Sequence, residues 1–218
     1  MSRAPSTNPI ASSRLSTARH VCAFFNSDDE EYTVLLPFMK DGFAHGKKAI
    51  HVVNSGQRSD HLQRLARAGI NAAAAERDGQ LEVRISTETY LRDGRFDQER
   101  MLQTFEEMVR SNVRTRFPSY RIVCRMDWAS KEPFYVQHVI EFESRVNELW
   151  QLYDDVVICT YQLSHFGGNA VIDILRTHPM AILGGVLYEN PFFVPPKEFL
   201  HGLRSRRAAR DGGPSAAD

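Results

Sequence analysis

The sequence lacks the features that mark several large classes of protein. None of its apolar runs approaches the roughly 20 residues that span a bilayer, and the N-terminus has no apolar core of the kind found in secretory signals. Lysine and arginine total 27, as do aspartate and glutamate, so the 218-residue chain carries no net charge. Duplex-binding proteins usually present a basic surface. We therefore expect a cytoplasmic protein with no membrane partner and no direct nucleic-acid partner.

Cysteine is also scarce, and its spacing argues against a disulfide framework or a zinc site. Cys22, Cys124 and Cys159 are far apart, and each falls inside an apolar run typical of a strand. Short-spaced Cys or Cys/His pairs, which such sites use, are missing. The pattern predicts three buried, reduced thiols, as in a cytosolic protein.

Histidine and glutamate side chains that could ligate a metal have simpler explanations in the sequence. His20 and His178 each border an expected strand, where a lone histidine is more often a hydrogen-bonded structural residue. Glu30 is explained as a helix cap, and Glu141 by a solvated helix face. We therefore expect no metal site and no cofactor.

Glycine is missing at the position where a nucleotide-binding α/β protein would need it. The apolar run His20–Phe25 is followed by Asn26-Ser27-Asp28-Asp29-Glu30-Glu31 and then by an amphipathic helix. In open α/β proteins, ligands bind beyond the carboxyl end of such a strand, and phosphates are held there by a glycine-rich loop. Carboxylates suit a helix N-terminus but repel phosphate. The pattern indicates a degenerate nucleotide site: the position is kept and the phosphate function is lost.

Strands alternate with helices along the chain, which predicts βαβ units. We expect a three-layer αβα fold with a mostly parallel central sheet, and the most apolar strand, Val156–Tyr161, at its centre. Expected strands cover 20–25, 49–53, 81–85, 121–128, 156–161 and, as the last one, 180–184. Expected helices begin at Ser27, Ser55, Asp97, Pro133 and Gly168, and an extended segment from 186 ends in a short helix near 199–203.

The two ends of the chain differ in composition from its middle. Residues 1–19 are rich in small residues, proline and arginine and contain no acid, and residues 204–218 are basic and then rich in glycine, proline and alanine. Such segments bury little apolar surface. We expect a disordered tail over 1–19, a single domain over 20–203, and a second disordered tail over 204–218.

Polar and aromatic residues gather where the expected strands end. In parallel sheets these ends share one edge, where side chains converge on a ligand. Asp127 either bonds a ligand or caps the following turn, and Trp128 and Phe166 either line a cleft or pack under loops. We see no nucleophile beside His165, so no catalytic residue and no enzymatic activity are expected. The candidate ligand-binding residues are Asn26, Asp28, Glu30, Asp127, Trp128, Tyr161, His165 and Phe166.

Over residues 20–200 the order of short motifs resembles that of the MEDS family, sensory domains of regulators in methanogens and methylotrophs. The motifs are His20-Val21-Cys22-x-Phe24-Phe25, Glu30-Glu31, Leu36-Pro37-Phe38, Gly42, Gly79-Gln80-Leu81, Tyr90-Leu91 with Gly94 and Phe96, Met126-x-Trp128, Phe142-Glu143 with Asn147, Cys159-x-Tyr161, Leu175-Arg176-Thr177-His178-Pro179, and Asn190-Pro191 with Val194-Pro195-Pro196. No single motif is diagnostic, and the resemblance rests on their order. The sequence departs from the family pattern at Cys124-Arg125, where Gly-Glu is common.

The resemblance implies a RecA/KaiC-like fold whose nucleotide loop has been lost, serving as a sensor of a small, hydrocarbon-derived ligand. Family members are often fused to an output module, so we expect this chain to signal through a separate kinase, anti-sigma factor or transcription factor. Two alternatives remain open: a protein-interaction module that needs no ligand, and a divergent NTPase. The sequence does not decide whether the chain forms a homo-oligomer.

Overall fold

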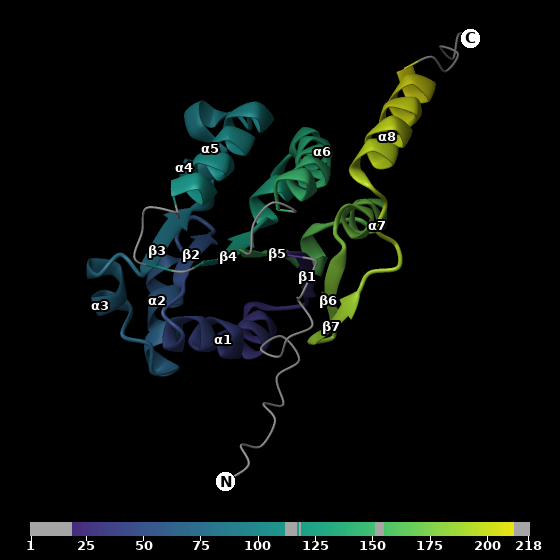
Figure 1. Ribbon diagram of the computed structural model, residues 1–218. Coiled ribbons are helices and arrows are strands. Elements are labelled where there is room, and N and C mark those ends of the chain that lie inside the picture. The colour runs from purple at the N-terminus through teal and green to yellow at the C-terminus, as the bar shows by residue number, and fades with distance from the viewer. Residues whose placement is uncertain (1–18, 112–116, 118, 151–154, 212–218) are drawn as a thin grey trace.

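The computed structural model describes residues 19–111, 117, 119–150 and 155–211, which form a layered α/β structure (Figure 1). A seven-stranded sheet has the order β3-β2-β4-β5-β1-β6-β7. Its neighbouring strands are parallel except for the antiparallel pair β6–β7. The strands are β1 (His20–Phe25), β2 (Lys48–Val53), β3 (Leu81–Ile85), β4 (Tyr120–Arg125), β5 (Val156–Gln162), β6 (Met180–Leu183) and β7 (Val186–Glu189). The prediction of a mostly parallel sheet is confirmed.

Helices cover both faces of this sheet, as Figure 1 shows from its edge. One face carries α1 (Asp28–Ala44), α2 (Arg58–Arg67) and α3 (Ala72–Arg77). The other carries α4 (Ser86–Tyr90), α5 (Gln98–Ser111), α6 (Pro133–Trp150), α7 (Gly168–Thr177) and α8 (Pro196–Asp211). Alternate residues of β1 enter different cores: Cys22 and Phe24 pack on the α6 face, and Val21 and Ala23 on the α1 face. This is the predicted three-layer αβα arrangement.

Strand β5 is central in the sheet, as its composition predicts. It lies between β4 and β1, and its residues from Val156 to Tyr161 are buried. A strand covered on both faces reads as a continuous apolar run, which is why its position could be read from the sequence. The three cysteines are free and buried, also as predicted.

The first helix begins at the expected residue. Ser27 is the N-cap, and its hydroxyl accepts a hydrogen bond from the Glu30 amide at 3.2 Å. Pro37 lies inside α1, which runs on to Ala44. Gly46 follows the helix with a φ of 66°, a left-handed conformation that glycine adopts readily.

The short elements depart from the sequence predictions. Helices α3 and α4 were not predicted, because six and five residues are too few to show a helical period. Strand 180–184 was wrongly expected to be the last, since β7 follows it in a hairpin. Gly184 and Gly185, with φ of 55° and 76°, form the tight turn of this hairpin, so the chain pairs as a strand where an extended segment was expected.

The C-terminal helix is longer than predicted. Disorder was expected from residue 204, but α8 continues to Asp211. Arg206 lies 3.0 Å from Asp173, and Arg207 lies 3.0 Å from Glu141, so these two basic residues pair with acids on α7 and α6. Residues 1–18 and 212–218 of the two expected tails lie outside the described residues, as do residues 112–116 of the helix that the sequence predicts over 97–117.

Candidate functional site

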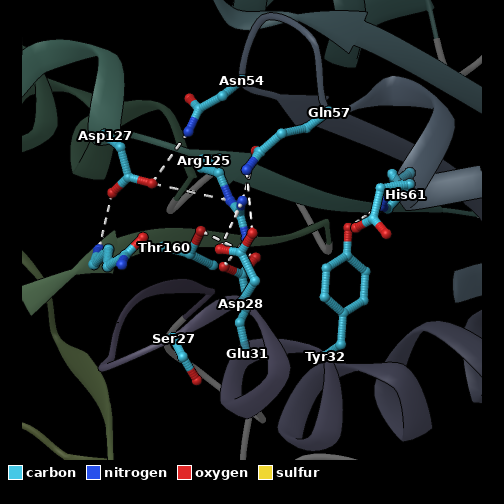
Figure 2. A network of polar contacts seen from close by, with 12 residues as sticks. Ser27, Asp28, Glu31, Tyr32, Asn54, Gln57, His61, Arg125, Asp127 and Thr160 are labelled. Carbon is cyan, nitrogen blue, oxygen red and sulfur yellow. Dashed lines mark hydrogen bonds and ion pairs between the residues drawn. The ribbon is translucent and has the colours of Figure 1, made fainter.

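A buried arginine lies at the centre of the polar network beyond the carboxyl ends of the parallel strands (Figure 2). Arg125 is the last residue of β4, and its side chain is 5% exposed. Its Nη2 donates to Glu31 Oε2 at 2.5 Å, and its Nη1 donates to Gln57 Oε1 at 2.6 Å and lies 3.1 Å from Asp28 Oδ1. Two carboxylates of the acidic turn (residues 26–31), those of Asp28 and Glu31, therefore share a cation that β4 provides.

Burial and charge oppose each other in this network. Burial lowers the pKa of Arg125, but the carboxylates of Glu31 and Asp28 outweigh that effect and raise its pKa above the ordinary value. Burial raises the pKa of Glu31, and the Arg125 guanidinium opposes that shift. Thr160 adds a donor to the same carboxylate, with its hydroxyl 3.3 Å from Glu31 Oε1. The guanidinium is thus held as a permanent cation by its acidic neighbours.

Asp127 joins the ends of three strands on the other side of Arg125 (Figure 2). Its Oδ1 accepts a hydrogen bond at 2.9 Å from the amide of Gln162, the last residue of β5. Its Oδ2 accepts one at 3.2 Å from Nδ2 of Asn54, which follows β2. The carboxylate is 6% exposed and lies 4.0 Å from Arg125 Nε. Asp127 therefore ties the sheet edge together and does not cap its own turn through the carboxylate.

A cavity of about 300 Å³ opens beside Asp127. Trp128 forms part of its wall and stacks on Tyr90, with ring centroids 4.8 Å apart. His165 is 44% exposed at the opening, and its Nδ1 lies 3.7 Å from Asp127 Oδ1. Three of the predicted ligand-binding residues therefore meet here. The cavity is lined by Asn54, Ser55, Ser86, Asp127, Trp128, Ser130, Lys131 and His165.

The other predicted residues lie elsewhere. Asn26 and Glu30 bond to each other at the start of α1, where the Asn26 amide donates to Glu30 Oε2 at 2.8 Å. Asp28 belongs to the Arg125 network. Tyr161 and Phe166 are buried on the α6 face of the sheet, packed ring to ring at 5.4 Å. The residues that were predicted to line one crevice therefore lie in separate parts of the structure.

A chain of polar side chains beside Arg125 was not predicted. Tyr32 Oη lies 2.7 Å from His61 Nδ1, and His61 Nε2 lies 2.9 Å from His51 Nδ1. Burial lowers the pKa of His51 well below its ordinary value. Burial, with Arg125 next in effect, lowers the pKa of His61 to about 4. Both imidazoles are therefore neutral at pH 7.

Arg125, Glu31 and Gln57 were also missed as site residues. The signal for Arg125 was a charged side chain at the end of an apolar strand. Such a charge needs a buried partner. The sequence gives no indication of which acid provides it.

A second polar cluster lies on the α6 face of the sheet. Among the described residues, His20, Glu143, Cys159 and His178 bring potential metal-ligating atoms within 4.8 Å of one another, and all four are buried. Burial raises the pKa of Glu143, but its hydrogen bond to His20 and the neighbouring His178 imidazole outweigh this and lower it. Burial lowers the pKa of His178 to about 3 and raises that of Cys159 well above its ordinary value.

Comparison with known proteins identifies relatives of this chain. A family model described as MEDS, the methanogen/methylotroph, DcmR sensory domain, matches residues 19–179. The transcriptional repressor DcmR of Methylorubrum extorquens (strain DSM 6343 / CIP 106787 / DM4) is 22% identical over 160 residues. That match covers 73% of this chain and 57% of the repressor. In the part of the chain that the structure describes, none of the helices has the length and apolar character needed to cross a bilayer.

Proposed function

The chain belongs to the MEDS family of sensory domains, and we propose that it binds a small molecule in the cavity beside Asp127 and signals through a separate regulatory protein in the cytoplasm. The observation that carries this proposal is the cavity itself, where Asp127, Trp128 and His165 meet. Kinase, anti-sigma and transcription-factor partners all fit such an output. The free, buried cysteines are compatible with a reducing compartment.

The cavity suits a small ligand with one polar group. Its volume of about 300 Å³ is at the lower end of the range for ligand pockets. The Trp128 ring gives an apolar wall, and Asp127, Ser130 and His165 offer hydrogen-bonding groups. Short halogenated or oxygenated hydrocarbons have this combination of size and polarity.

A ligand in this cavity would contact the residue that connects the strand ends. Asp127 bonds to Asn54 and to the Gln162 amide, and lies next to Arg125, which holds the start of α1. A ligand that competes for the Asp127 carboxylate changes the balance of these contacts. For the ligand to change the surface that a partner binds, it must bind one conformation of the chain more tightly than another.

Filling the cavity from its exposed edge is expected to abolish the response to ligand. Ser55 lines the cavity and is exposed, so Ser55→Trp places an indole in the opening without entering a core. In a thermal-shift screen of short halogenated and oxygenated hydrocarbons, a compound at about 100 times its Kd stabilises the wild type by about 2.7 kcal/mol. Ser55→Trp should lose that shift.

Ser205→Trp, at an exposed serine on α8, is the matched control and should keep the wild-type shift. A screen in which no compound raises the wild-type melting temperature would contradict ligand sensing. A Ser55→Trp variant that responds like the wild type would place the ligand elsewhere.

The wild-type chain is expected to show no saturable binding of ATP or GTP with Mg²⁺ at micromolar concentrations. Carboxylates of Asp28 and Glu31 occupy the position beyond β1, and the buried cation there, Arg125, is already bonded to Glu31. Isothermal titration calorimetry measures this, with pyrophosphate titrated in parallel to separate phosphate recognition from base recognition. A micromolar Kd for either nucleotide would favour the divergent NTPase over the ligand sensor that we propose.

An exposed apolar surface favours the alternative of a ligand-independent interaction module. Leu183, Val186 and Tyr188 are 41%, 40% and 49% exposed on the β6–β7 hairpin. Leu183 is opposite Val186 in the register, and Tyr188 is two residues further along β7, so the three share a face. Exposed apolar residues at a sheet edge are common in binding surfaces. Under this alternative, Ser55→Trp leaves partner binding unchanged.

A further inference from the structure

Four side chains from distant parts of the chain meet in the core between the sheet and helices α6 and α7. His20 begins β1, Glu143 lies on α6, Cys159 lies on β5, and His178 directly follows α7. Each is at most 4% exposed. They form a buried cluster of two imidazoles, one carboxyl group and one thiol.

The distances between donor atoms are close to those around a tetrahedral metal ion. Glu143 Oε2 lies 3.0 Å from His20 Nε2 and 3.6 Å from His178 Nε2. Cys159 Sγ lies 3.6 Å from both His20 Nε2 and Glu143 Oε2. Metal–ligand bonds of about 2.0–2.3 Å at tetrahedral angles place neighbouring donors about 3.3–3.6 Å apart. All four donors already lie within 4.8 Å of one another.

Hydrogen bonds fix the His20 ring with its Nε2 lone pair directed into the cluster. Asn147 Nδ2 donates to the carbonyls of Glu143 and Thr177 at 3.0 and 2.6 Å, so its Oδ1 is the acceptor. That Oδ1 lies 3.1 Å from His20 Nδ1, which must therefore carry the proton. A histidine whose second nitrogen donates to an amide or carbonyl oxygen in this way is oriented as metal ligands usually are.

His178 is oriented in the same way. Its Nδ1 lies 2.9 Å from the Ile174 carbonyl, which can only accept, so this nitrogen also carries the proton. Its Nε2 is fully buried and has no hydrogen-bond partner among the described residues. Tyr161 donates to Glu143 Oε1 at 3.0 Å, which leaves Oε2 facing the two imidazoles.

Three acceptor atoms therefore face one another in the core: His20 Nε2, His178 Nε2 and Glu143 Oε2. Such an arrangement is unfavourable unless a cation lies among them. A single proton can separate one pair, His20 and Glu143, but leaves His178 Nε2 without a partner. A divalent ion satisfies all three atoms, and with an ionised Glu143 and an ionised Cys159 the buried site has no net charge.

We propose that His20, Glu143, Cys159 and His178 form a closed structural site for a divalent transition-metal ion, best suited to Zn²⁺. Two imidazoles, a thiolate and a carboxylate are all ligands that zinc accepts in four-coordinate structural sites. On binding, the Cys159 thiol proton and the proton between His20 and Glu143 are released to solvent. The ion joins β1, β5, α6 and α7. This departs from the sequence-based expectation of no metal site.

Cobalt provides the test, because a thiolate bound to Co²⁺ gives a near-ultraviolet charge-transfer band, and tetrahedral Co²⁺ gives strong visible bands. The full chain is unfolded with a chelator and refolded with Co²⁺, since the site is closed. We expect both bands at a single ion per chain, their loss on adding Zn²⁺, and zinc in the protein as purified. Cys159→Ser should abolish the charge-transfer band.

Cys124→Ser is the matched control. Cys124 is paired in register with Cys159 on the neighbouring strand and is equally buried, but it is not in the cluster, so its variant should keep both bands. His178→Gln should weaken Co²⁺ binding at least about tenfold, and it gives a second measurement if Cys159→Ser does not fold. A wild type that refolds without taking up Co²⁺, or a charge-transfer band that survives in Cys159→Ser, would overturn the proposal.

Discussion

Replacing Arg125 with methionine is expected to lower the free energy of unfolding by about 3–5 kcal/mol, the range for removing one partner of a buried ion pair. The Glu31 carboxylate would remain 12% exposed at the same place, with Asp28 and Asp127 nearby and no guanidinium among them. Methionine fills a similar volume, so most of the loss is electrostatic. Urea denaturation at pH 7 measures it, provided that the m-value is unchanged.

An exposed arginine gives the matched control for this substitution. Arg110 is 70% exposed and pairs with Glu106 one turn earlier on α5, so Arg110→Ala should change the free energy of unfolding by less than about 0.5 kcal/mol. The double variant Arg125→Met/Glu31→Leu should recover part of the loss, because it removes the stranded carboxylate as well. A loss below about 1 kcal/mol for Arg125→Met would show that the acids do not depend on the guanidinium for their stability.

The arginine also explains how an acidic turn can follow the first strand. Asp28, Glu31 and Asp127 would repel one another without a shared cation, and Arg125 lies within 4.0 Å of each. The acids and the arginine are thus one unit, supplied by β4 and by the start of α1. In a nucleotide-binding protein of this fold class the same region would hold phosphates. Here the protein itself provides both the anions, which are the carboxylates, and the cation, which is Arg125.

Most of the sheet could be predicted from the sequence, because its strands are buried on both faces and read as apolar runs. The position of β5 and the start of α6 at Pro133 follow from that composition and from proline's preference for the first helical turn. Strand β7 and helices α3 and α4 could not be predicted by period, because each element is too short to show one.

The candidate site was predicted only in part, and strand geometry gives the reason. Successive side chains on a strand point to opposite faces. Thr160 bonds to Glu31 on the α1 face, so Tyr161 lies on the α6 face, where it donates to Glu143. The sequence shows that Thr160 and Tyr161 point to opposite faces, but it does not show which of the two faces carries the polar network. Pairing of Arg125 with Glu31 depends on contacts across the fold that no local pattern specifies.

Acid is expected to destabilise the protein between pH 6.5 and about 4, and His61 is expected to account for about 2 kcal/mol of the loss between pH 7 and pH 5. Its imidazole is 2% exposed, between Tyr32 and His51. Because its folded-state pKa is below the unfolded value, the unfolded chain binds the proton first as the pH falls. The stabilising contribution is complete above about pH 6.5 and is lost toward pH 4. His51, also lowered by burial, acts in the same direction.

Comparing the wild type with His61→Gln separates the contribution of His61 from that of the carboxylates, which titrate in the same pH range. His61→Gln keeps a polar group near Tyr32 but has no proton to bind, so the fall in unfolding free energy from pH 7 to pH 5 should be smaller than in the wild type by about 2 kcal/mol. His45→Gln is the control, because His45 is 64% exposed and has no comparable desolvation. An equal fall in the wild type and His61→Gln would mean that the imidazole takes up its proton in the folded state. The folded protein would then hold a positive charge between Tyr32 and His51 and close to Arg125. Such a result would contradict the lowered pKa of His61 on which this prediction rests.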